Sequence, residues 1–408
     1  MTPDTVLMFA YHFPPENAIG GLRPFRFYKY LSRNGLKCHV ITAAAGAADI
    51  VPDAESIPDL FLTESRGGLG WQFERAVRKL VLPAVTGTRW AFAASRAGQM
   101  FLRANPSARV VILSTYPPLG PHLAAWRLAH LTKLPWVTDF RDPMGDNPAN
   151  ILMPRRSRLI ERFLERRTMR DARAVVANTD GAAERLRKIY PQWRDKIHLI
   201  WNGFDPEARV HPAPLSMSSR KVMSHVGSLY GSRDAKPLLE SIARLVDCGR
   251  LRPEAILLRL VGVAKPDSVP GPELLQKAAR QGWLELITEQ VPQSQAQGIT
   301  ASSGATLLIQ PRSTLQVPGK LFEYLQIGRP ILAYLPPDSP SERILQHSGI
   351  PYRCVYAGKE PAVMDQQIAE FFEMPWADAV PSPWFEEHFN AERQTAALQR
   401  LLESVATG

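Results

Sequence analysis

The segment PGKLFEYLQIGRPILAYL, at residues 318–335, predicts a helix followed by a buried strand. Pro318 suits the first helical position, because its missing N–H costs nothing there. Gly328, two residues before Pro330, marks the helix end, and an apolar run follows. A helix that runs straight into a buried strand is one repeat of a parallel α/β fold.

The start of this helix carries groups that suit a phosphorylated ligand. Gly319 has no side chain, so a ligand can approach its backbone. Lys320 and Glu323 lie about one helical turn apart. A helix N-terminus with a lysine and an inward carboxylate fits a phosphate-plus-ribose ligand. An ordinary amphipathic helix with a surface Lys–Glu pair explains the same residues equally well.

Short apolar strands alternate with helical segments along the whole chain. Expected strands are residues 6–10, 39–42, 109–114, 136–140, 174–178, 197–201, 222–227, 256–261, 284–288, 305–309, 331–335 and 353–356. Expected helices are residues 23–34, 119–131, 156–170, 181–190, 236–248, 272–281, 318–327 and 362–373. This alternation predicts parallel sheets covered on both faces, with ligands bound beyond the carboxyl ends of the strands.

The 408 residues are too many for one typical core. The Pro- and Ser-rich stretch HPAPLSMSSR, at residues 211–220, has no apolar period and breaks the chain in two. We therefore expect an α/β fold with two Rossmann-like domains whose parallel sheets face a central cleft. The expected division is residues 1–205, a linker at 206–220, residues 221–383, and a helical segment at 384–408 that packs back on the first domain. The irregular segment 65–90 fits a packed helix pair or a membrane or acceptor surface.

Basic residues are concentrated in the first half of the chain. Residues 1–205 hold 29 Lys and Arg against 18 Asp and Glu, a net charge of +11, while the remaining residues carry a net charge of −1. This asymmetry suggests a polyanionic partner. An apolar run of membrane-spanning length and a signal-peptide pattern are both missing. The three widely spaced cysteines fit neither a metal site nor a disulfide pattern, and they suit a reducing compartment. We expect a cytoplasmic protein.

One basic helix stands out within that half. The stretch RRSRLIERFLERRTMRDAR, at residues 155–173, holds eight arginines and three acids around an apolar stripe of Leu159, Ile160, Phe163 and Leu164. It fits a solvated helix whose stripe packs on the core, or a helix that binds anionic headgroups at the inner face of a membrane. Aromatic and basic residues do not alternate as in stacking motifs, so nucleic acid is the least favoured partner.

Two loops of the first half follow expected strands. YHFPPENAIGGLRPFRF, at residues 11–27, places Gly20 and Gly21 before a helix that starts near Arg23 or Pro24. Such a glycine pair lets a phosphate or sugar approach the backbone, but it is not a dinucleotide fingerprint. A flexible turn is the alternative.

The loop WVTDFRDPMGD, at residues 136–146, places Asp139, Arg141 and Asp142 at the end of the next strand. The arginine could orient a phosphate or a sugar acid. The aspartates could bind sugar hydroxyls or fix that arginine, and a structural Asp–Arg pair is an equally good reading.

A similar loop opens the second half. SHVGSLYGSRDAKPL, at residues 224–238, runs from strand to loop to helix. Gly227 and Ser228 can offer backbone N–H groups, and Arg233 or Lys236 can offer charge, which suits a pyrophosphate. A basic surface loop is the alternative. Ahead of it, IWNGFD at residues 200–205 forms a turn at a strand end.

The order of these pieces resembles glycosyltransferase family 4 on a GT-B fold. The resemblance spans almost the full chain and rests on FPPENAIGGLRPFRFYKYLSRNGLKCHVIT, STYPPLGPHLAAW, DFRDPM, IWNGFD, HVGSLYGSRD and PGKLFEYLQIGRPIL. Each piece alone is weak, and the combination is specific. The chain is most similar to the branch that builds bacterial surface polysaccharides and lipid-linked glycans.

The resemblance implies transfer of a sugar from a nucleotide-activated donor with retention of configuration and without a metal or other cofactor. A UDP-sugar is favoured over a GDP-sugar, and the acceptor is a glycan or a polyprenyl-linked glycan. The resemblance implies that Glu323 binds the donor ribose, Arg233 the diphosphate and Lys320 a second part of it. The other implied donor residues are Gly20, Gly21, Gly227, Ser228, Pro318 and Gly319, and His122, Asp139, Arg141 and Asp142 line the acceptor side. Arg233, Lys320, Glu323 and His122 are the implied catalytic group.

One position departs from the family pattern. The family's commonest signature has a first glutamate eight positions before the second, and counting back from Glu323 gives Leu315. Arg312, Ser313, Thr314 and Gln316 around it are polar but carry no carboxylate. The donor-sugar contact is therefore open, and a catalytically silent nucleotide-sugar-binding protein of the same fold is the alternative function.

Overall fold

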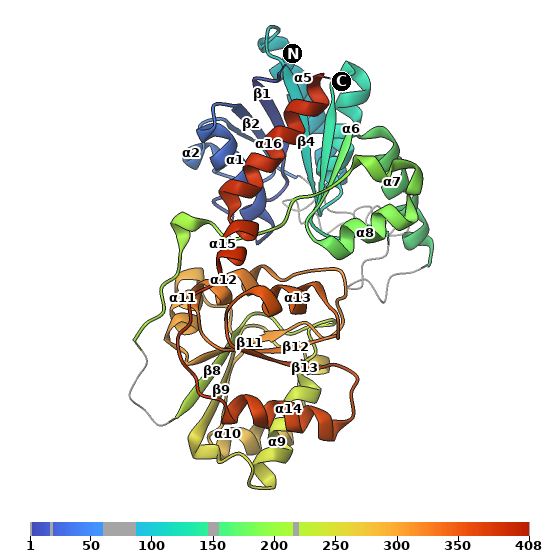
Figure 1. Cartoon of the computed structure of the whole chain (residues 1–408). Coiled ribbons are helices and arrows are strands. Elements are labelled where there is room, and N and C mark those ends of the chain that lie inside the picture. Colours follow the sequence, from blue (N-terminus) through green and yellow to red (C-terminus); the bar gives the residue numbers. More distant parts are fainter. Residues whose placement is uncertain (1, 17–18, 60–86, 146–154, 215–219, 408) are drawn as a thin grey trace, which may run out of the picture. The chain divides into compact units, whose positions relative to one another are not determined.

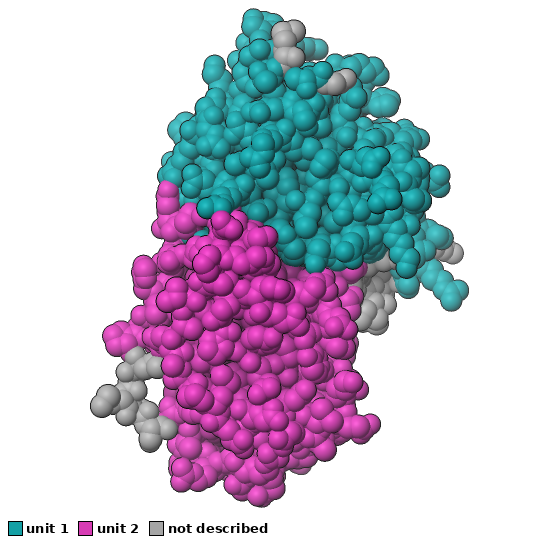
Figure 2. Space-filling view, viewed as in Figure 1, with its two compact units in different colours: residues 1–205, 391–408 teal, residues 206–390 magenta. Residues whose placement is uncertain are grey.

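The computed structural model describes residues 2–16, 19–59, 87–145, 155–214 and 220–407. The chain divides into two compact units (Figures 1 and 2). Unit 1 comprises residues 1–205 and 391–408, and unit 2 comprises residues 206–390. Most of the irregular segment expected at 65–90, and residues 215–219 of the expected linker, lie outside the described residues.

Unit 1 is built on a seven-stranded sheet in which every described pairing is parallel. Its strands are β1 (Thr5–Phe9), β2 (Lys37–Thr42), β3 (Ala54–Ser56), β4 (Val110–Tyr116), β5 (Trp136–Phe140), β6 (Ala174–Ala177) and β7 (Ile197–Leu199). The order is β3-β2-β1-β4-β5-β6-β7, so the strand order reverses between β1 and β4. Ligands of open α/β sheets bind beyond the carboxyl ends of the strands at such a reversal.

Helices cover both faces of this sheet (Figure 1). They are α1 (Ile19–Arg33), α2 (Ala47–Ile50), α5 (Thr88–Ala104), α6 (Gly120–Thr132), α7 (Arg155–Asp171), α8 (Asp180–Ile189) and α16 (Ala391–Thr407). Successive residues of β1 enter opposite cores, with Leu7 and Phe9 in one cluster and Val6 and Met8 in the other. A strand buried on both faces reads as a continuous apolar run, which explains why its position was predictable.

Unit 2 repeats the plan with six parallel strands in the order β10-β9-β8-β11-β12-β13. They are β8 (Lys221–Val226), β9 (Ile256–Val261), β10 (Leu284–Ile287), β11 (Ala305–Ile309), β12 (Ile331–Leu335) and β13 (Tyr352–Tyr356). Its helices are α9 (Lys236–Asp247), α10 (Pro272–Arg280), α11 (Gln293–Ser302), α12 (Gly319–Ile327), α13 (Pro340–His347), α14 (Pro361–Glu373) and α15 (Pro383–Phe389). The two parallel sheets confirm the predicted α/β class with two Rossmann-like halves.

The segment at 318–335 forms α12 and β12. Pro318 is the N-cap residue, so the helix starts at Gly319, one residue later than expected. At the other end Gly328 has a φ of 77°, and a Cβ atom there would overlap the carbonyl oxygen of Ala379. Glycine is therefore required at this helix end for both backbone and space.

Several elements differ from the sequence-based expectation. Helices α2, α5, α11 and α13 and strand β3 were not expected. The buried side of α5 consists largely of small residues, among them Ala91, Ala94 and Ala97, and gives a weak apolar pattern. The expected C-terminal helical segment is two helices, which meet at Asn390.

The chain crosses between the two units twice, after Asp205 and after Asn390. A backbone hydrogen bond within unit 1 joins the residues beside these two crossings. The backbone N–H of Ala391 donates to the carbonyl oxygen of Phe204 at 2.9 Å. Beyond this bond α16 packs on α1, and Leu398 and Leu402 enter the core that α1 covers (Figure 1). Residues 383–389 (α15) belong to unit 2, so the chain changes unit between Asn390 and Ala391.

Two features bear on membranes. No helix among the described residues is long and apolar enough to cross a bilayer. The stripe of α7 is divided: Leu164 packs against the core, whereas Leu159 and Phe163 are 64% and 63% exposed. The expectation that the whole stripe packs on the core is therefore wrong for these two residues.

We expect Leu402→Ala to lower the free energy of unfolding of unit 1 by about 2–5 kcal/mol, because it removes a fully buried side chain. Hydrogen–deuterium exchange of β1 and β2 measures the effect within unit 1. Arg400→Ala, at an exposed position of the same helix, is the control and changes stability by no more than about 0.5 kcal/mol. Unaltered protection of both strands in Leu402→Ala would contradict a structural role of α16 in unit 1.

Candidate functional site

Unit 2 holds a cation directly over a glycine at the carboxyl end of β8. Gly227 follows the strand and donates its backbone N–H to the Val261 carbonyl at 2.7 Å. A Cβ atom at Gly227 would overlap the ammonium of Lys320, so only glycine leaves room for that side chain. The predicted glycine loop and the predicted helix start therefore meet at one point.

The neighbouring loop after β9 approaches the same turn. Gly262 has a φ of 126°, and a Cβ atom on it would lie 2.8 Å from the carbonyl carbon of Gly227. Ser228 is half-buried beside this contact. The close approach of the two loops fixes the backbone at Gly227 and Ser228, as a site for phosphate oxygens requires.

The first turn of α12 adds backbone donors. Leu321 donates its N–H to the Pro318 carbonyl at 3.0 Å, so the helix begins with a tight turn. The N–H groups of Gly319 and Lys320 precede the first possible intrahelical bond. Together with the helix dipole they favour an anion at this end of α12.

Charged side chains gather at the same place. Burial and, second, the Arg233 guanidinium lower the pKa of Lys320 to about 8, while the Glu323 carboxylate raises it. Arg233 is half-buried and lies 5.5 Å from the centre of the Tyr230 ring. Two cations beside helix N–H groups are suited to a diphosphate. Glu323, one turn further along α12, is half-buried, and its predicted ribose contact stays a prediction.

The loop before α12 contains Leu315, at the position where the family signature has its first glutamate. Leu315 is half-buried there. Ser313 and Gln316 are tied to each other, because Gln316 donates its backbone N–H to Ser313 Oγ at 3.2 Å. Arg312 Nη2 lies 3.4 Å from an Asp234 oxygen. The polar side chains of residues 312–316 are thus two hydroxyls, an amide and a guanidinium, with no carboxylate.

In unit 1 the predicted glycine pair lies within a helix rather than before one. Helix α1 starts at Ile19, so Gly20 and Gly21 belong to its first turn, and the expected start near Arg23 is wrong. Pro24 sits inside the helix and has no N–H to donate to the Gly20 carbonyl four residues earlier. Arg141 Nη1 donates to that carbonyl instead, at 2.8 Å. An arginine from the next loop thus completes the first turn of α1.

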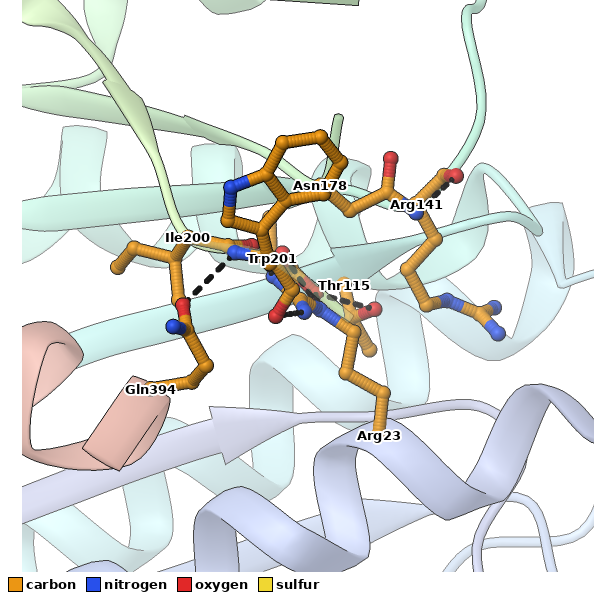
Figure 3. A network of polar contacts seen from close by, with 8 residues as sticks. Arg23, Thr115, Arg141, Asn178, Ile200, Trp201 and Gln394 are labelled. Atoms are coloured by element: carbon orange, nitrogen blue, oxygen red, sulfur yellow. Dashed lines mark hydrogen bonds and ion pairs between the residues drawn. The ribbon is translucent and has the colours of Figure 1, made fainter. Parts of the chain in front are cut away.

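Arg141 is otherwise held by backbone groups. Its Nη2 donates to the Pro117 carbonyl. Its own carbonyl accepts from Asn178 Nδ2 at 2.7 Å, as Figure 3 shows. Burial lowers the pKa of Arg141, and the half-buried Asp142 opposes that shift most strongly. Its Nε is buried without a hydrogen-bond partner in the described structure. Arg141 therefore retains one donor that a bound anion could use.

Asp139 forms a buried ion pair with Arg23 rather than with Arg141. Both residues are almost inaccessible, with 1% and 4% of their surface exposed. Arg23 Nη2 donates to Asp139 Oδ1 at 2.8 Å and Nε donates to Oδ2 at 3.0 Å (Figure 3). Thr115 Oγ1 donates to the same carboxylate at 3.2 Å. Of the two readings of Asp139, a structural pair is the one that its contacts favour.

Arg23 also fixes the turn at the end of β7. It donates to the carbonyls of Ile200 and Trp201 at 2.8 and 2.7 Å. Trp201 in turn donates its backbone N–H to Gln394 Oε1 of α16 at 2.8 Å (Figure 3). Asp205, at the end of the same IWNGFD segment, accepts from Tyr30 at 2.7 Å. This segment is therefore part of the framework of unit 1.

His122 lies in the first turn of α6 and is buried. Trp136 Nε1 donates to Ser114 Oγ at 2.8 Å, and Ser114 Oγ lies 2.9 Å from His122 Nδ1. Burial first, and Arg141 second, lower the pKa of His122 to about 3, so the ring is neutral near pH 7. Its Nε2 is buried with no partner among the described atoms. The catalytic role of His122 stays a prediction.

Sequence reasoning missed Arg23, Thr115 and His225. Arg23 pairs with a residue 116 positions away, and no local spacing reveals such a contact. Thr115 and His225 lie inside apolar strands, where a polar residue must find a buried partner. A polar residue within an apolar strand was therefore the sequence signal that could have revealed Thr115 and His225.

Comparison with known families matches residues 25–208 to the family described as Glycosyltransferase Family 4. A comparison with curated proteins found no match. Among solved structures the chain is similar to sucrose-phosphate synthase from Thermosynechococcus elongatus, at 11% identity over 99% of this chain and 96% of that one, with a TM-score of 0.61. It is also similar to a glycosyltransferase from Rickettsia africae, at 11% identity over 99% and 93% of the two chains, with a TM-score of 0.58.

A third similar structure is HepE from Anabaena in complex with UDP-glucose, at 13% identity over 99% of this chain and 96% of that one, with a TM-score of 0.53. At such low identity these likenesses establish the fold. They confirm the GT-B architecture that the sequence predicts.

We expect Asp139→Asn to lower the free energy of unfolding of unit 1 by about 3 kcal/mol or more, because Arg23 is left as an uncompensated buried charge. Asp4→Asn removes the carboxylate of an exposed pair with Arg109 in the same unit and costs at most about 1 kcal/mol. Urea denaturation followed by exchange protection of β4 and β5 compares the two variants. Equal costs would argue against the structural role of Asp139.

Proposed function

We propose that the chain is a nucleotide-sugar glycosyltransferase of glycosyltransferase family 4, to whose model residues 25–208 match. We propose that it transfers the sugar with retention of configuration to a glycan or polyprenyl-linked acceptor in surface polysaccharide biosynthesis. One observation carries the donor half of this proposal. The Lys320 ammonium lies over Gly227 at the start of α12, beside Arg233.

The proposed chemistry needs no protein nucleophile. The glycosidic bond to the diphosphate breaks, and negative charge develops on the leaving oxygen. Arg233, Lys320 and the N–H groups of α12 stabilise that charge more in the transition state than in the ground state. The acceptor hydroxyl attacks from the same face, and its proton passes to the departing phosphate. Gly227, Ser228, Pro318 and Gly319 supply the close backbone around the diphosphate.

The favoured donor is a UDP-sugar. HepE was solved with UDP-glucose and with UDP, and an Escherichia coli trehalose-6-phosphate protein was solved with UDP-2-fluoro glucose. These relatives share the fold, and their ligands support UDP over GDP. In the proposal Glu323 accepts hydrogen bonds from the ribose hydroxyls.

The acceptor side of the proposal lies in unit 1. Gly20 and Gly21, in the first turn of α1, are proposed to lie beside both the donor phosphates and the acceptor, and the unpartnered Nε of Arg141 offers a hydrogen-bond donor beside them. Asp142 is half-buried next to Arg141, and His122 contributes a neutral hydrogen-bonding group. Asp139 acts in this proposal through Arg23, since its oxygens already accept from Arg23 and Thr115.

We also propose that the protein works at the inner face of a membrane. On α7, exposed Arg155, Arg158, Arg162 and Arg166 surround the exposed Leu159 and Phe163 on one helix face. Of the three acids of that stretch, Glu161 and Glu165 are buried and Asp171 is half-buried. Arginines attract anionic headgroups, and the two apolar side chains can enter the interface between headgroups and acyl chains.

A binding and turnover experiment tests the function. A thermal-shift screen of UDP-, GDP- and dTDP-sugars should raise the Tm with one base, because the ligand binds the native state. Glu323→Ala should then weaken donor binding about tenfold or more, since a hydrogen bond to a charged group is worth about 1.5–3 kcal/mol. Calorimetry measures that loss, and Glu373→Ala, an exposed carboxylate in α14, is the control.

Two outcomes would count against the proposal. Unchanged donor affinity in Glu323→Ala would remove the ribose assignment. The second outcome is nucleotide binding without acceptor-dependent nucleotide release over a panel of glycan and lipid-linked acceptors. It would favour the alternative function, a catalytically silent nucleotide-sugar-binding protein, which the leucine at position 315 suggests.

Vesicle sedimentation tests the membrane proposal. We expect the wild type to sediment with vesicles rich in anionic phospholipid at low salt, and Leu159→Ser with Phe163→Ser to weaken this binding about tenfold, because apolar area no longer enters the bilayer. Val380→Ser, at an 85% exposed apolar position of unit 2, is the matched control. Wild-type protein that stays in solution with these vesicles would show that the idea is wrong.

A further inference from the structure

His225 is a buried histidine that the proposed transfer does not use. It lies in β8, two residues before Gly227. Its Nδ1 is 2.9 Å from the carbonyl oxygen of Leu307 in β11. A carbonyl can only accept, so Nδ1 carries the proton and Nε2 presents a lone pair. That Nε2 is buried without a hydrogen-bond partner in the described part of the chain.

Nε2 of His225 and Nζ of Lys320 both lie close to the Cα atom of Gly227. A Cβ atom at Gly227 would overlap Lys320 Nζ and would lie only 3.4 Å from His225 Nε2. Lys320 therefore occupies the space that glycine leaves open, and His225 Nε2 lies at van der Waals distance from that space. Burial first, and the charge of Lys320 second, lower the pKa of His225 to about 3. The imidazole is thus a neutral acceptor beside a cation.

A hydrogen bond between Lys320 Nζ and His225 Nε2 would give each group a partner. Among the described residues no hydrogen bond or ion pair to Lys320 Nζ is present, although Glu323 and Arg233 act on it electrostatically. A buried acceptor without a partner is costly, and a hydrogen bond from the half-buried Lys320 ammonium would remove that cost. The side chain of lysine is flexible, so its ammonium can turn toward Nε2.

We propose that His225 is a positioning residue whose Nε2 accepts a hydrogen bond from the Lys320 ammonium and holds that cation over Gly227, with its other N–H donors directed at the leaving diphosphate. This inference rests on the proposed function and adds a residue to it. A purely structural role, in which His225 only packs and bonds Leu307, is the competing explanation.

Two substitutions separate these roles. In His225→Asn the side-chain amide can still donate to the Leu307 carbonyl, but nothing replaces Nε2. In His225→Gln the amide reaches the position of Nε2. We expect Asn to weaken UDP binding about tenfold and Gln to restore it to within about threefold, because a hydrogen bond to a charged group is lost and regained. Calorimetry with UDP gives both values.

A double-mutant cycle tests whether His225 acts through Lys320. In a Lys320→Met background, His225→Asn should change UDP affinity by less than about twofold, because the group it positions is gone. The pH profile is the second readout. Donor kcat/KM of the wild type should fall as the pH rises through about 8, where Lys320 of the unliganded enzyme loses its proton. His225→Asn should move this fall to lower pH, since an acceptor of the ammonium is lost, and His225→Gln should restore it.

Imidazole NMR of the wild type keeps the test independent of how the variants fold. The ¹⁵N shifts should report an Nδ1–H tautomer, and the Nε2 shift should change in Lys320→Met. An Nε2–H tautomer, additive effects in the cycle or an unmoved pH profile in His225→Asn would overturn this inference and leave the proposed function intact. A wild type that binds neither UDP nor GDP would overturn both.

Discussion

The ion pair between Arg23 and Asp139 is the contact on which the carboxyl edge of unit 1 depends. A buried guanidinium is tolerable only if its donors are satisfied, and Arg23 reaches Asp139 in β5 and the carbonyls of Ile200 and Trp201 after β7. Helix α1, two strand ends and the turn toward α16 are therefore fixed by one side chain. The loops that carry the proposed acceptor groups are held on this frame.

Unit 2 uses charge in the opposite way. The half-buried Lys320 ammonium lies beside a second cation, and its lowered pKa shows that the charge is unfavourable there. Such a cation destabilises the empty protein but gains a strong partner when an anion arrives. A glycine that makes room for it and a histidine that stays neutral beside it keep the site basic without adding a counter-ion.

Sequence patterns predicted the framework better than the contacts within it. Strands β9, β11 and β12 have the predicted ends, because fully buried strands are apolar runs bounded by glycine, proline or polar residues. Helix α5 was not predicted because alanines form much of its buried side. The start of α1 was misplaced because Pro24 resembled a first helical residue. The fold class, and the similarity of residues 25–208 to glycosyltransferase family 4, were predictable from ordered motifs. The partner of Asp139 was not, since the nearby Arg141 is the local candidate and the distant Arg23 is the real one.

The hydrogen bond between Ala391 and Phe204 has a consequence for the order of events during synthesis. Unit 2 is inserted between two parts of unit 1, and Leu398 and Leu402 of the last helix belong to the core beneath α1. A ribosome that has completed residues 1–205 has released every strand of the first sheet but not the helix that closes one of its faces. The second unit is thus complete before the first, and the apolar surface that Leu398 and Leu402 cover stays open until residues 391–407 emerge.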